Sequence, residues 1–308
     1  MRQNTRSFFH AERYSPILRI GLAVAALAAA ISCSKLGIGD KGPTAPTGPP
    51  AAGSTIVYTA VGASDASGVG SSSVCAPFAT ETTCPNGMGY VPVTVRLLKA
   101  QGFTVTHRNL GIPTAVIGRD FQTLGQQYNR IIAGNFIEQE MNFVLNNSTV
   151  VTIFAGVNEV NTVTAALGAG AGGSDPNGYM DTQVRAFGTD YATLLAGIRA
   201  VAGSPRIIVL NVPNAAGLPY LAGASLAQRQ AAQRLSVGMA RAVNALSNVV
   251  VVDLMCDARS YVAGNYSSDG LHPNDAGYAF IASEVVKAMT TSAYPLAQNS
   301  CTAMTIVP

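Results

Sequence analysis

Residues 54–72 read STIVYTAVGASDASGVGSS, a run of strand-forming residues that breaks abruptly at Gly62-Ala63-Ser64-Asp65. Small polar residues commonly close strands, so an ordinary Gly/Ser-rich loop is one interpretation. The other is that Ser64 is a nucleophile held at the carboxyl end of a strand. That role needs a base, an orienting acid and oxyanion donors elsewhere in the chain.

Short β-branched runs alternate with longer segments of helical character along the chain. The pattern predicts strands at 55–61, 104–109, 149–155, 206–212 and 249–254, and helices at 90–101, 120–132, 135–146, 179–202, 225–247 and 274–290. This alternation predicts an α/β fold with three layers, in which helices cover both faces of a parallel sheet of about five strands. Ligands of such sheets bind outside the carboxyl ends of the strands, which is where Ser64 lies.

Three further stretches occupy equivalent places. They are RNLGIPTAVIG at 108–118, FAGVNEVN at 154–161 and SSDGLHPNDAGY at 267–278. Taken in order with the stretch around Ser64, they resemble the four blocks of the SGNH, or GDSL, hydrolase family, and the resemblance covers about 55–290. It implies a flavodoxin-like SGNH hydrolase fold.

The resemblance also implies roles for individual residues. Ser64 matches the nucleophile, Asn158 the oxyanion-hole asparagine, and Asp269 and His272 the Asp-x-x-His pair that completes the triad. In the family the other oxyanion donors are the backbone N–H groups of the nucleophile and of a block-two glycine. Thr114 stands at the glycine position here, so the expected oxyanion hole is Ser64, Thr114 and Asn158.

The same chemistry follows from the residue types. A serine hydroxyl needs an adjacent imidazole, and beyond the N-terminal segment the chain offers only His107 and His272. His107 falls within a predicted strand, where a satisfied structural histidine is expected. His272 precedes Pro273, a favoured first helical residue, and Gly270 permits a tight turn that brings Asp269 close to the ring.

Two departures from related patterns are visible near Ser64. Ala63 stands where the family name has Asp, but that Asp is not part of the triad. The residue two after Ser64 is Ala66, so the Gly-x-Ser-x-Gly elbow of α/β-hydrolases is not present. Glu159 and Asn161 are interpreted as bracing groups and not as catalysts.

The composition argues against several other classes of function. The chain has 19 Lys and Arg against 16 Asp and Glu, and the first 33 residues hold four Arg and one Glu, which leaves the remainder neutral. No nucleic-acid partner is therefore expected. No metal and no cofactor are expected either, because the chain lacks His-Glu-x-x-His, a phosphate loop and a dinucleotide fingerprint. We expect a monomer.

The N-terminus predicts export. Four arginines precede an uncharged apolar run from Ile20 to Ile31, which is too short to span a bilayer and is typical of a signal peptide. The run ends in Ala-Ile-Ser-Cys33, which resembles a lipobox. We therefore expect a lipoprotein signal peptide at 1–32, a lipidated Cys33 with a Pro/Gly-rich tether at 33–54, and the hydrolase domain at 55–308, anchored to the outer membrane or facing the periplasm.

Cysteine counting supports lipidation of Cys33. The chain has five cysteines, and using Cys33 as the lipidation site leaves four. Three pairings of these are possible. We favour Cys75–Cys84, which brackets one short segment, and Cys256–Cys301, which brackets the C-terminal segment.

The predicted function is an exported serine hydrolase that cleaves carboxylic esters. The segments 165–179 and 214–221, expected to wall the pocket, are small and apolar, which suits short acyl, aryl or lipid esters or thioesters. The absence of Trp removes the best sugar-stacking side chain, but a carbohydrate O-deacetylase remains an alternative. The other alternative is a lipoprotein that binds a ligand without turnover.

Overall fold

The computed structural model describes residues 46–308. The predicted signal peptide, the lipidation site Cys33 and most of the predicted tether lie outside the described residues. No helix within 46–308 combines the length and the apolar character needed to cross a membrane.

A single parallel sheet forms the centre of the fold. Its five strands lie in the order β2-β1-β3-β4-β5, and all neighbouring strands pair in parallel. Their bounds are β1 Thr55–Gly62, β2 Thr104–Asn109, β3 Val150–Phe154, β4 Arg206–Leu210 and β5 Val250–Val252. Every residue of β3 and β4 is buried, as expected for strands that are covered on both faces.

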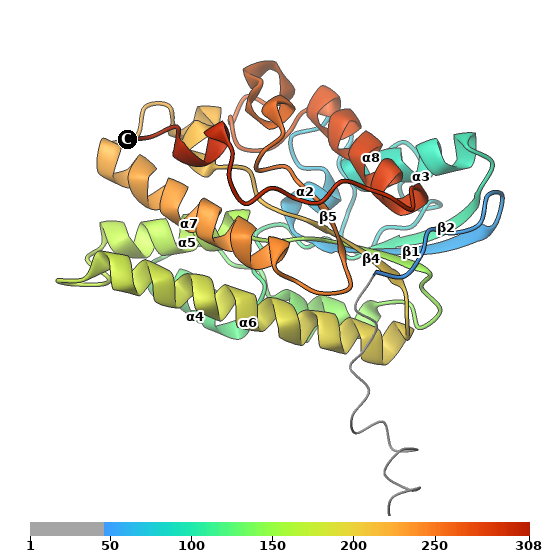
Figure 1. Cartoon of the computed structure of the whole chain (residues 1–308), viewed down its shortest axis with the longest axis horizontal. Coiled ribbons are helices and arrows are strands. Elements are labelled where there is room, and N and C mark those ends of the chain that lie inside the picture. The colour runs from blue at the N-terminus through green and yellow to red at the C-terminus, as the bar shows by residue number, and fades with distance from the viewer. Residues whose placement is uncertain (1–45) are drawn as a thin grey trace, which may run out of the picture. The chain divides into compact units, whose positions relative to one another are not determined.

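Helices cover both faces of the sheet (Figure 1). On one face α3 (Tyr90–Ala100) packs against α8 (Asp275–Thr290). The other face is covered by α4 (Arg119–Gln127), α5 (Val157–Gly168), α6 (Pro176–Ala202) and α7 (Leu226–Asn244). The predicted three-layer α/β/α fold with a five-stranded parallel sheet is confirmed.

The helix starts follow from local sequence. Ser225 caps α7 by accepting a hydrogen bond from the N–H of Gln228. Asp175 caps α6 by accepting one from the N–H of Gly178, and Pro176 occupies the first turn of that helix. These caps satisfy N–H groups that would otherwise lack partners at the helix start.

Two predictions of secondary structure were wrong. The helix predicted at 135–146 is a short π-helix, Phe136–Glu140, followed by a 3₁₀ turn, Met141–Phe143, because Glu140 turns inward to accept a bond from the N–H of Gly62. The helix α5 was not predicted, because its Val and Thr residues have low helix propensity. Packing decides the outcome, since Val160 and Val163 are fully buried against the core.

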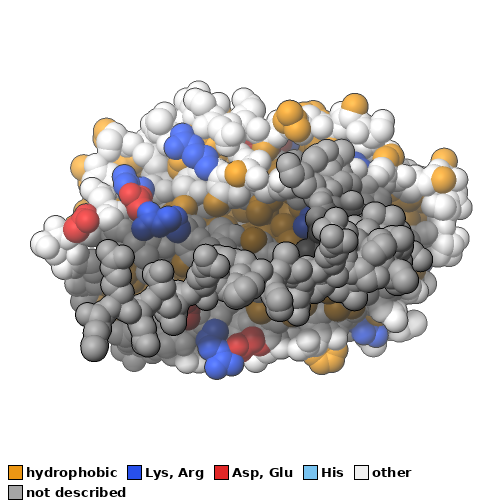
Figure 2. Space-filling model, turned by 60° about the horizontal axis from the view of Figure 1, so that its bottom comes forward, with side chains coloured by type: hydrophobic (Ala, Val, Ile, Leu, Met, Phe, Trp, Pro, Cys, Tyr) orange, Lys and Arg blue, Asp and Glu red, His pale blue; other side chains and the backbone are white. Residues whose placement is uncertain are grey.

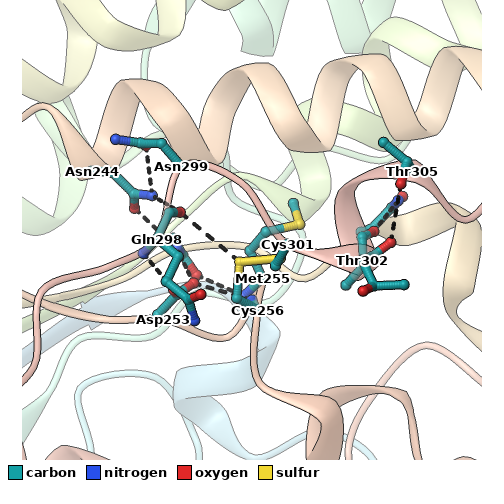
Figure 3. Close-up of a disulfide and its surroundings, with 12 residues drawn as sticks. Asn244, Asp253, Met255, Cys256, Gln298, Asn299, Cys301, Thr302 and Thr305 are labelled. Carbon is teal, nitrogen blue, oxygen red and sulfur yellow. Dashed lines mark hydrogen bonds between the residues drawn. A yellow bond between two sulfur atoms is a disulfide. The ribbon is translucent and has the colours of Figure 1, made fainter.

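Two disulfides link Cys75 to Cys84 and Cys256 to Cys301, the pairing that was favoured from the sequence. The second one ties the C-terminal segment to the loop that follows β5 (Figure 3). Beside it, Asn244 donates to the carbonyl of Gln298, and Asp253 accepts from the N–H of the same residue. The C-terminal segment is therefore held along α7 by covalent and polar contacts.

The surface carries no single region of one charge on the face that Figure 2 shows. Where side chains are coloured there, positive and negative groups form small scattered groups, some of them side by side, between apolar and neutral surface. One ion pair of the described surface joins Arg234 and Asp181, whose charged atoms lie 2.8 Å apart. This distribution agrees with the neutral charge balance of the sequence.

Candidate active site

Ser64 lies directly after β1, at the carboxyl end of the sheet. It is the first residue of the one-turn helix α2 (Ser64–Ser67). The residue is 7% exposed, and its Oγ lies 2.9 Å from Nε2 of His272. A strand that ends on a sharp turn therefore presents the hydroxyl to an imidazole.

The imidazole and an acid share one loop between η6 (Ala263–Asn265) and α8. Oδ2 of Asp269 lies 2.6 Å from Nδ1 of His272, on the side of the ring opposite Ser64. Oδ1 of Asp269 accepts hydrogen bonds from the N–H groups of Leu271 and His272 and from the hydroxyl of Ser267. The acid thus fixes both the ring and the loop that carries it.

The charge of Asp269 follows from these contacts. Burial alone would raise the pKa of Asp269, but the hydrogen bonds from the ring and backbone of His272, from Leu271 and from Ser267 outweigh it and hold the pKa below its ordinary value. The carboxyl is therefore ionised over the whole neutral pH range, as required of a group that stabilises an imidazolium.

Two glycines allow the catalytic loop to pack closely. Gly270 has φ +68°, and a Cβ there would lie 2.7 Å from the backbone nitrogen of Tyr220, which donates to the Gly270 carbonyl. Gly70, in the loop after Ser64, has φ +93°, and a Cβ there would lie 2.7 Å from Cβ of His272. The loop that carries His272 therefore meets the Tyr220 segment at Gly270 and the loop after Ser64 at Gly70, with no room for a side chain at either glycine.

The start of α8 differs from the expectation. Pro273 is not the first helical residue, because Asn274 caps the helix by accepting bonds from the N–H groups of Ala276 and Gly277. Asp275 is the first residue, and its carboxylate accepts bonds from the N–H and the hydroxyl of Ser72. The loop of His272 and the loop that follows Ser64 are thereby joined through the start of α8.

The three expected oxyanion donors fall in neighbouring segments. Asn158 is the second residue of α5, and its Nδ2 donates to the carbonyl of Ala115 at 2.8 Å. Ala115 directly follows Thr114. The Asn158 amide has a second N–H, which is available to a ligand in the cavity that both Asn158 and Ser64 line.

Thr114 has the backbone conformation of a glycine. Its φ is +69°, in the left-handed region that a β-branched residue rarely adopts. Its hydroxyl accepts a hydrogen bond from the N–H of Ala133. Within residues 46–308 the backbone N–H groups of Thr114 and Ser64 have no acceptor, so both are available as donors.

A largely apolar cavity opens beside Ser64. Its walls come from the ends of β3 and β5, the start of α5, the segment 213–218 and the first half of α8; the apolar lining residues are Phe154, Val157, Leu218, Leu254, Phe280 and Ile281. Asp65, next to Ser64, also lines it. Burial raises the pKa of Asp65.

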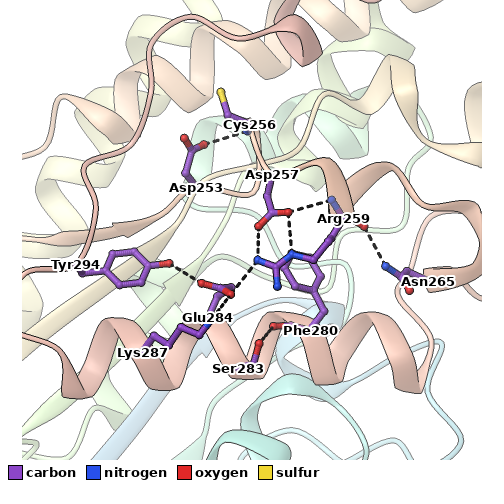
Figure 4. Close-up of polar contacts among 10 residues, drawn as sticks. All are labelled: Asp253, Cys256, Asp257, Arg259, Asn265, Phe280, Ser283, Glu284, Lys287 and Tyr294. Carbon is purple, nitrogen blue, oxygen red and sulfur yellow. Dashed lines mark hydrogen bonds and ion pairs between the residues drawn. The ribbon is translucent and has the colours of Figure 1, made fainter.

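Charged residues support the outer wall of this cavity (Figure 4). Arg259 forms ion pairs with Asp257 and Glu284, and its guanidinium lies 4.3 Å over the ring of Phe280. Glu284 is also paired with Lys287. The network fixes the Phe280 side of the cavity, because each charge has a partner.

Two buried carboxyls support the oxyanion side. Glu140 accepts from the N–H of Gly62, two residues before the nucleophile, and Glu159 accepts from the N–H of Ile117. Burial raises the pKa of Glu140 well above its ordinary value and raises that of Glu159 to about 7. Glu159 is the brace that the sequence suggested, whereas nothing in the local sequence of Glu140 indicated such a role.

The remaining histidine has no catalytic neighbours. His107 is 8% exposed on β2, and burial lowers its pKa. The sequence predicted a histidine with its hydrogen bonds satisfied, and this was wrong. Nδ1 of His107 has no hydrogen-bond partner within the described part of the chain. In that same part, no group of three or more His, Cys, Asp or Glu side chains could hold a metal ion.

Comparison with known proteins gives the family. Residues 60–280 match the model of the GDSL-like lipase/acylhydrolase family. A search of curated proteins finds no relative.

Among solved structures, the lipase Lip_vut3 from a goat rumen metagenome is 16% identical, with 80% of this chain and 100% of that chain covered and a TM-score of 0.48. A lipase/acylhydrolase from Enterococcus faecalis is 18% identical, with 75% and 94% covered and a TM-score of 0.46. The acetylxylan esterase Axe2 from Geobacillus stearothermophilus is 14% identical, with 84% and 100% covered and a TM-score of 0.48. Because the family model spans most of the sequence, the chain belongs to the GDSL-like lipase/acylhydrolase family.

Proposed function

We propose that the protein is a carboxylic ester hydrolase that acts through Ser64, His272 and Asp269. The observation that carries the proposal is the chain of contacts from Ser64 Oγ to His272 Nε2 at 2.9 Å and from His272 Nδ1 to Asp269 Oδ2 at 2.6 Å. Ser64 and His272 line a cavity with mostly apolar walls. Nucleophile, base and orienting acid in that order are what acyl transfer to serine requires.

The proposed reaction has two halves. In the first, Ser64 Oγ bonds to the ester carbonyl carbon while His272 Nε2 takes the hydroxyl proton. The oxyanion accepts hydrogen bonds from Asn158 and from the N–H groups of Ser64 and Thr114. The C–O bond to the alcohol then breaks, and the proton passes from His272 to the leaving oxygen.

In the second half, water attacks the acyl-enzyme. His272 takes a proton from the water and returns it to Ser64 Oγ as the acid is released. Asp269 keeps Nδ1–H pointing at itself throughout, so that Nε2 is free to accept. The apolar cavity beside Ser64 holds the acyl group.

Labelling with a fluorophosphonate probe tests the nucleophile. We expect one adduct on Ser64, no adduct in Ser64→Ala, and an unchanged adduct in Ser72→Ala, a serine on the same loop whose hydroxyl bonds Asp275. A panel of 4-nitrophenyl esters of increasing acyl length then gives the acyl preference. A folded protein that binds these esters without labelling or turnover would refute the proposal and favour a binding function.

An acetylated xylooligosaccharide belongs in the same panel. Preferential release of acetate from it, over release of 4-nitrophenol from the simple acetate ester, would favour the alternative of carbohydrate O-deacetylation. Both outcomes use the same triad, so the Ser64→Ala control applies to both.

We further propose that the enzyme is exported and anchored through a lipid on Cys33. The proposal is supported by the signal-like run before Cys33 and by the pairing of the other four cysteines in two disulfides. Residue 34 is Ser and not the Asp that marks retention at the inner membrane, so we expect the outer membrane where the host has one. We expect wild-type protein in the membrane fraction and Cys33→Ala outside it; wild-type protein in the soluble fraction with an unmodified Cys33 would refute the anchor.

A further inference from the structure

A wide groove adjoins the catalytic cavity. It is lined by α5, by the starts of α6 and α7, and by the loop that holds Tyr220. Leu271, next to the base His272, lines both the groove and the catalytic cavity. We call this groove the α5–α7 groove. A substrate bound at Ser64 that is too long for the cavity extends into it past Leu271.

A row of polar side chains leads along this groove from the oxyanion hole. Asn161 lies three residues after Asn158 on α5, and residues at this spacing are neighbours on one helix face. Asn161 Oδ1 accepts a hydrogen bond from the hydroxyl of Tyr220 at 2.8 Å. Arg130 lines the same groove beside Tyr220, and the guanidinium and the phenol are close enough to influence each other's pKa.

The guanidinium of Arg130 has no partner. Its Nε is buried without a hydrogen bond, and no ion pair or hydrogen bond from its side chain occurs within residues 46–308. Burial lowers the pKa of Arg130, in keeping with a side chain that is half-buried in the wall of the groove. A partly buried charge is stabilised by a counter-charge, which an anion bound in the groove would supply.

No acidic side chain is available to fill this role. Among the groove-lining residues of 46–308 none is Asp or Glu. Arg234, the other cation of the groove, is already paired with Asp181 at 2.8 Å. Arg130 is therefore the groove cation that retains its full capacity to bind an anion.

We propose that Arg130 binds an anionic group, a phosphate or a carboxylate, on the alcohol half of the ester, and so selects substrates that carry one. This rests on the proposed esterase function, in which the cavity holds the acyl half and leaves the α5–α7 groove for the alcohol. Both anions present paired oxygens that match the fork of a guanidinium. Asn161 and Tyr220 are the polar side chains that line the groove between Asn158 and this anion site.

Two matched substrate pairs test the proposal. One pair is 1-butanoylglycerol 3-phosphate and 1-butanoylglycerol, and the other is 4-(butanoyloxy)benzoate and 4-(butanoyloxy)benzamide. In each pair the acyl group is the same and only the anion differs. We expect the wild-type protein to give a higher kcat/KM for the anionic member of at least one pair, and the favoured pair identifies phosphate or carboxylate.

The variants separate binding of the anion from general effects of charge. We expect Arg130→Gln to lower kcat/KM for the preferred anionic ester by about 10- to 50-fold, the loss of one charge-assisted contact, and to change its neutral partner by less than about threefold. Arg130→Lys should recover part of the loss. Arg234→Gln removes a charge from the same groove that is already paired, so we expect less than about a threefold change for either ester.

Failure of this proposal differs from failure of the esterase function. Equal kcat/KM values within both pairs, or equal losses for the anionic and neutral esters in Arg130→Gln, would overturn the role of Arg130 while esterase activity stands. If the wild-type protein cleaves none of the four esters, the esterase function fails. Calorimetric binding of the same compounds to Ser64→Ala then still decides: an anionic ester that binds no tighter than its neutral partner overturns the anion site.

Discussion

Replacing Asp269 by Asn changes the chemistry of the site without changing its shape. Asn Oδ1 can accept the same three bonds that Asp269 Oδ1 accepts, at 2.8, 2.8 and 2.9 Å, so the loop keeps its conformation. In place of Oδ2, which lies 2.6 Å from Nδ1 of His272 in the wild type, the variant has an NH₂ group that faces Nδ1. Since an amide N–H donates, Nδ1 must give up its proton and Nε2 must carry it.

This change of tautomer removes the base. A protonated Nε2 lies 2.9 Å from Ser64 Oγ and cannot accept the hydroxyl proton. We expect kcat for Asp269→Asn to fall by about 10⁴-fold, the loss known for a wrong tautomer in a serine triad, which corresponds to about 5 kcal/mol of activation free energy. KM should change little, because the substrate-binding walls are untouched.

The assay is steady-state hydrolysis of 4-nitrophenyl butanoate between pH 6 and 9, with circular dichroism to check the fold. Ser267→Ala is the matched control, because it removes one bond to Oδ1 of Asp269 and leaves Oδ2 facing the ring. We expect it to retain kcat within about tenfold of the wild type. A folded Asp269→Asn protein with kcat within tenfold of the wild type would refute the assigned role of Asp269.

Three further predictions concern the surroundings of the triad. Asn158→Ala should lower kcat by about 10²–10³-fold with little change in KM, because it removes a donor to the charge that develops on the carbonyl oxygen; a kcat within threefold of the wild type would exclude it as a donor. Thr114→Gly keeps the backbone N–H and suits φ +69°, so we expect kcat within about tenfold of the wild type; a large loss that Thr114→Ser does not share would assign the donor to the hydroxyl instead. Burial raises the pKa of Glu159 from 4.5 to about 7, so the folded state keeps a proton that the unfolded chain releases, and this group's contribution to the free energy of unfolding is lost between about pH 4.5 and 7. That loss amounts to about 3 kcal/mol. In urea unfolding across this pH range, the free energy of unfolding should fall less steeply with pH for Glu159→Gln than for the wild type. An equal fall in the free energy of unfolding for both proteins would contradict this role of Glu159.

The strands and the contacts among Ser64, His272 and Asp269 could be predicted because their signals are local. Each strand is a short run rich in β-branched residues, and the predicted bounds fall within a few residues of those observed. Ser64, Asn158 and the Asp269–His272 pair each belong to a short motif that follows or precedes a recognisable element. Parallel strands bring such motifs to one edge of the sheet, so order along the chain was enough to assemble them.

The supporting groups could not be predicted, because nothing next to them in the sequence marks them. Glu140 contacts the N–H of Gly62, a residue 78 positions away in the sequence, and Arg130 lies in the loop that follows α4. The segment 165–179 was expected to wall the pocket beside Ser64, but part of it is α5 and it lines the α5–α7 groove instead. Long-range packing, and not local propensity, decides these placements.

The bond between Ser64 and His272 joins residues 208 positions apart in the sequence. During synthesis Ser64 leaves the ribosome long before His272. The hydrogen bonds that Ser72 donates to Asp275 form only once α8 has also emerged. A nascent or truncated chain that ends before His272 therefore has a serine of ordinary reactivity. The proposed activity therefore requires that α8 has docked, so it reports that the chain has folded as far as Thr290.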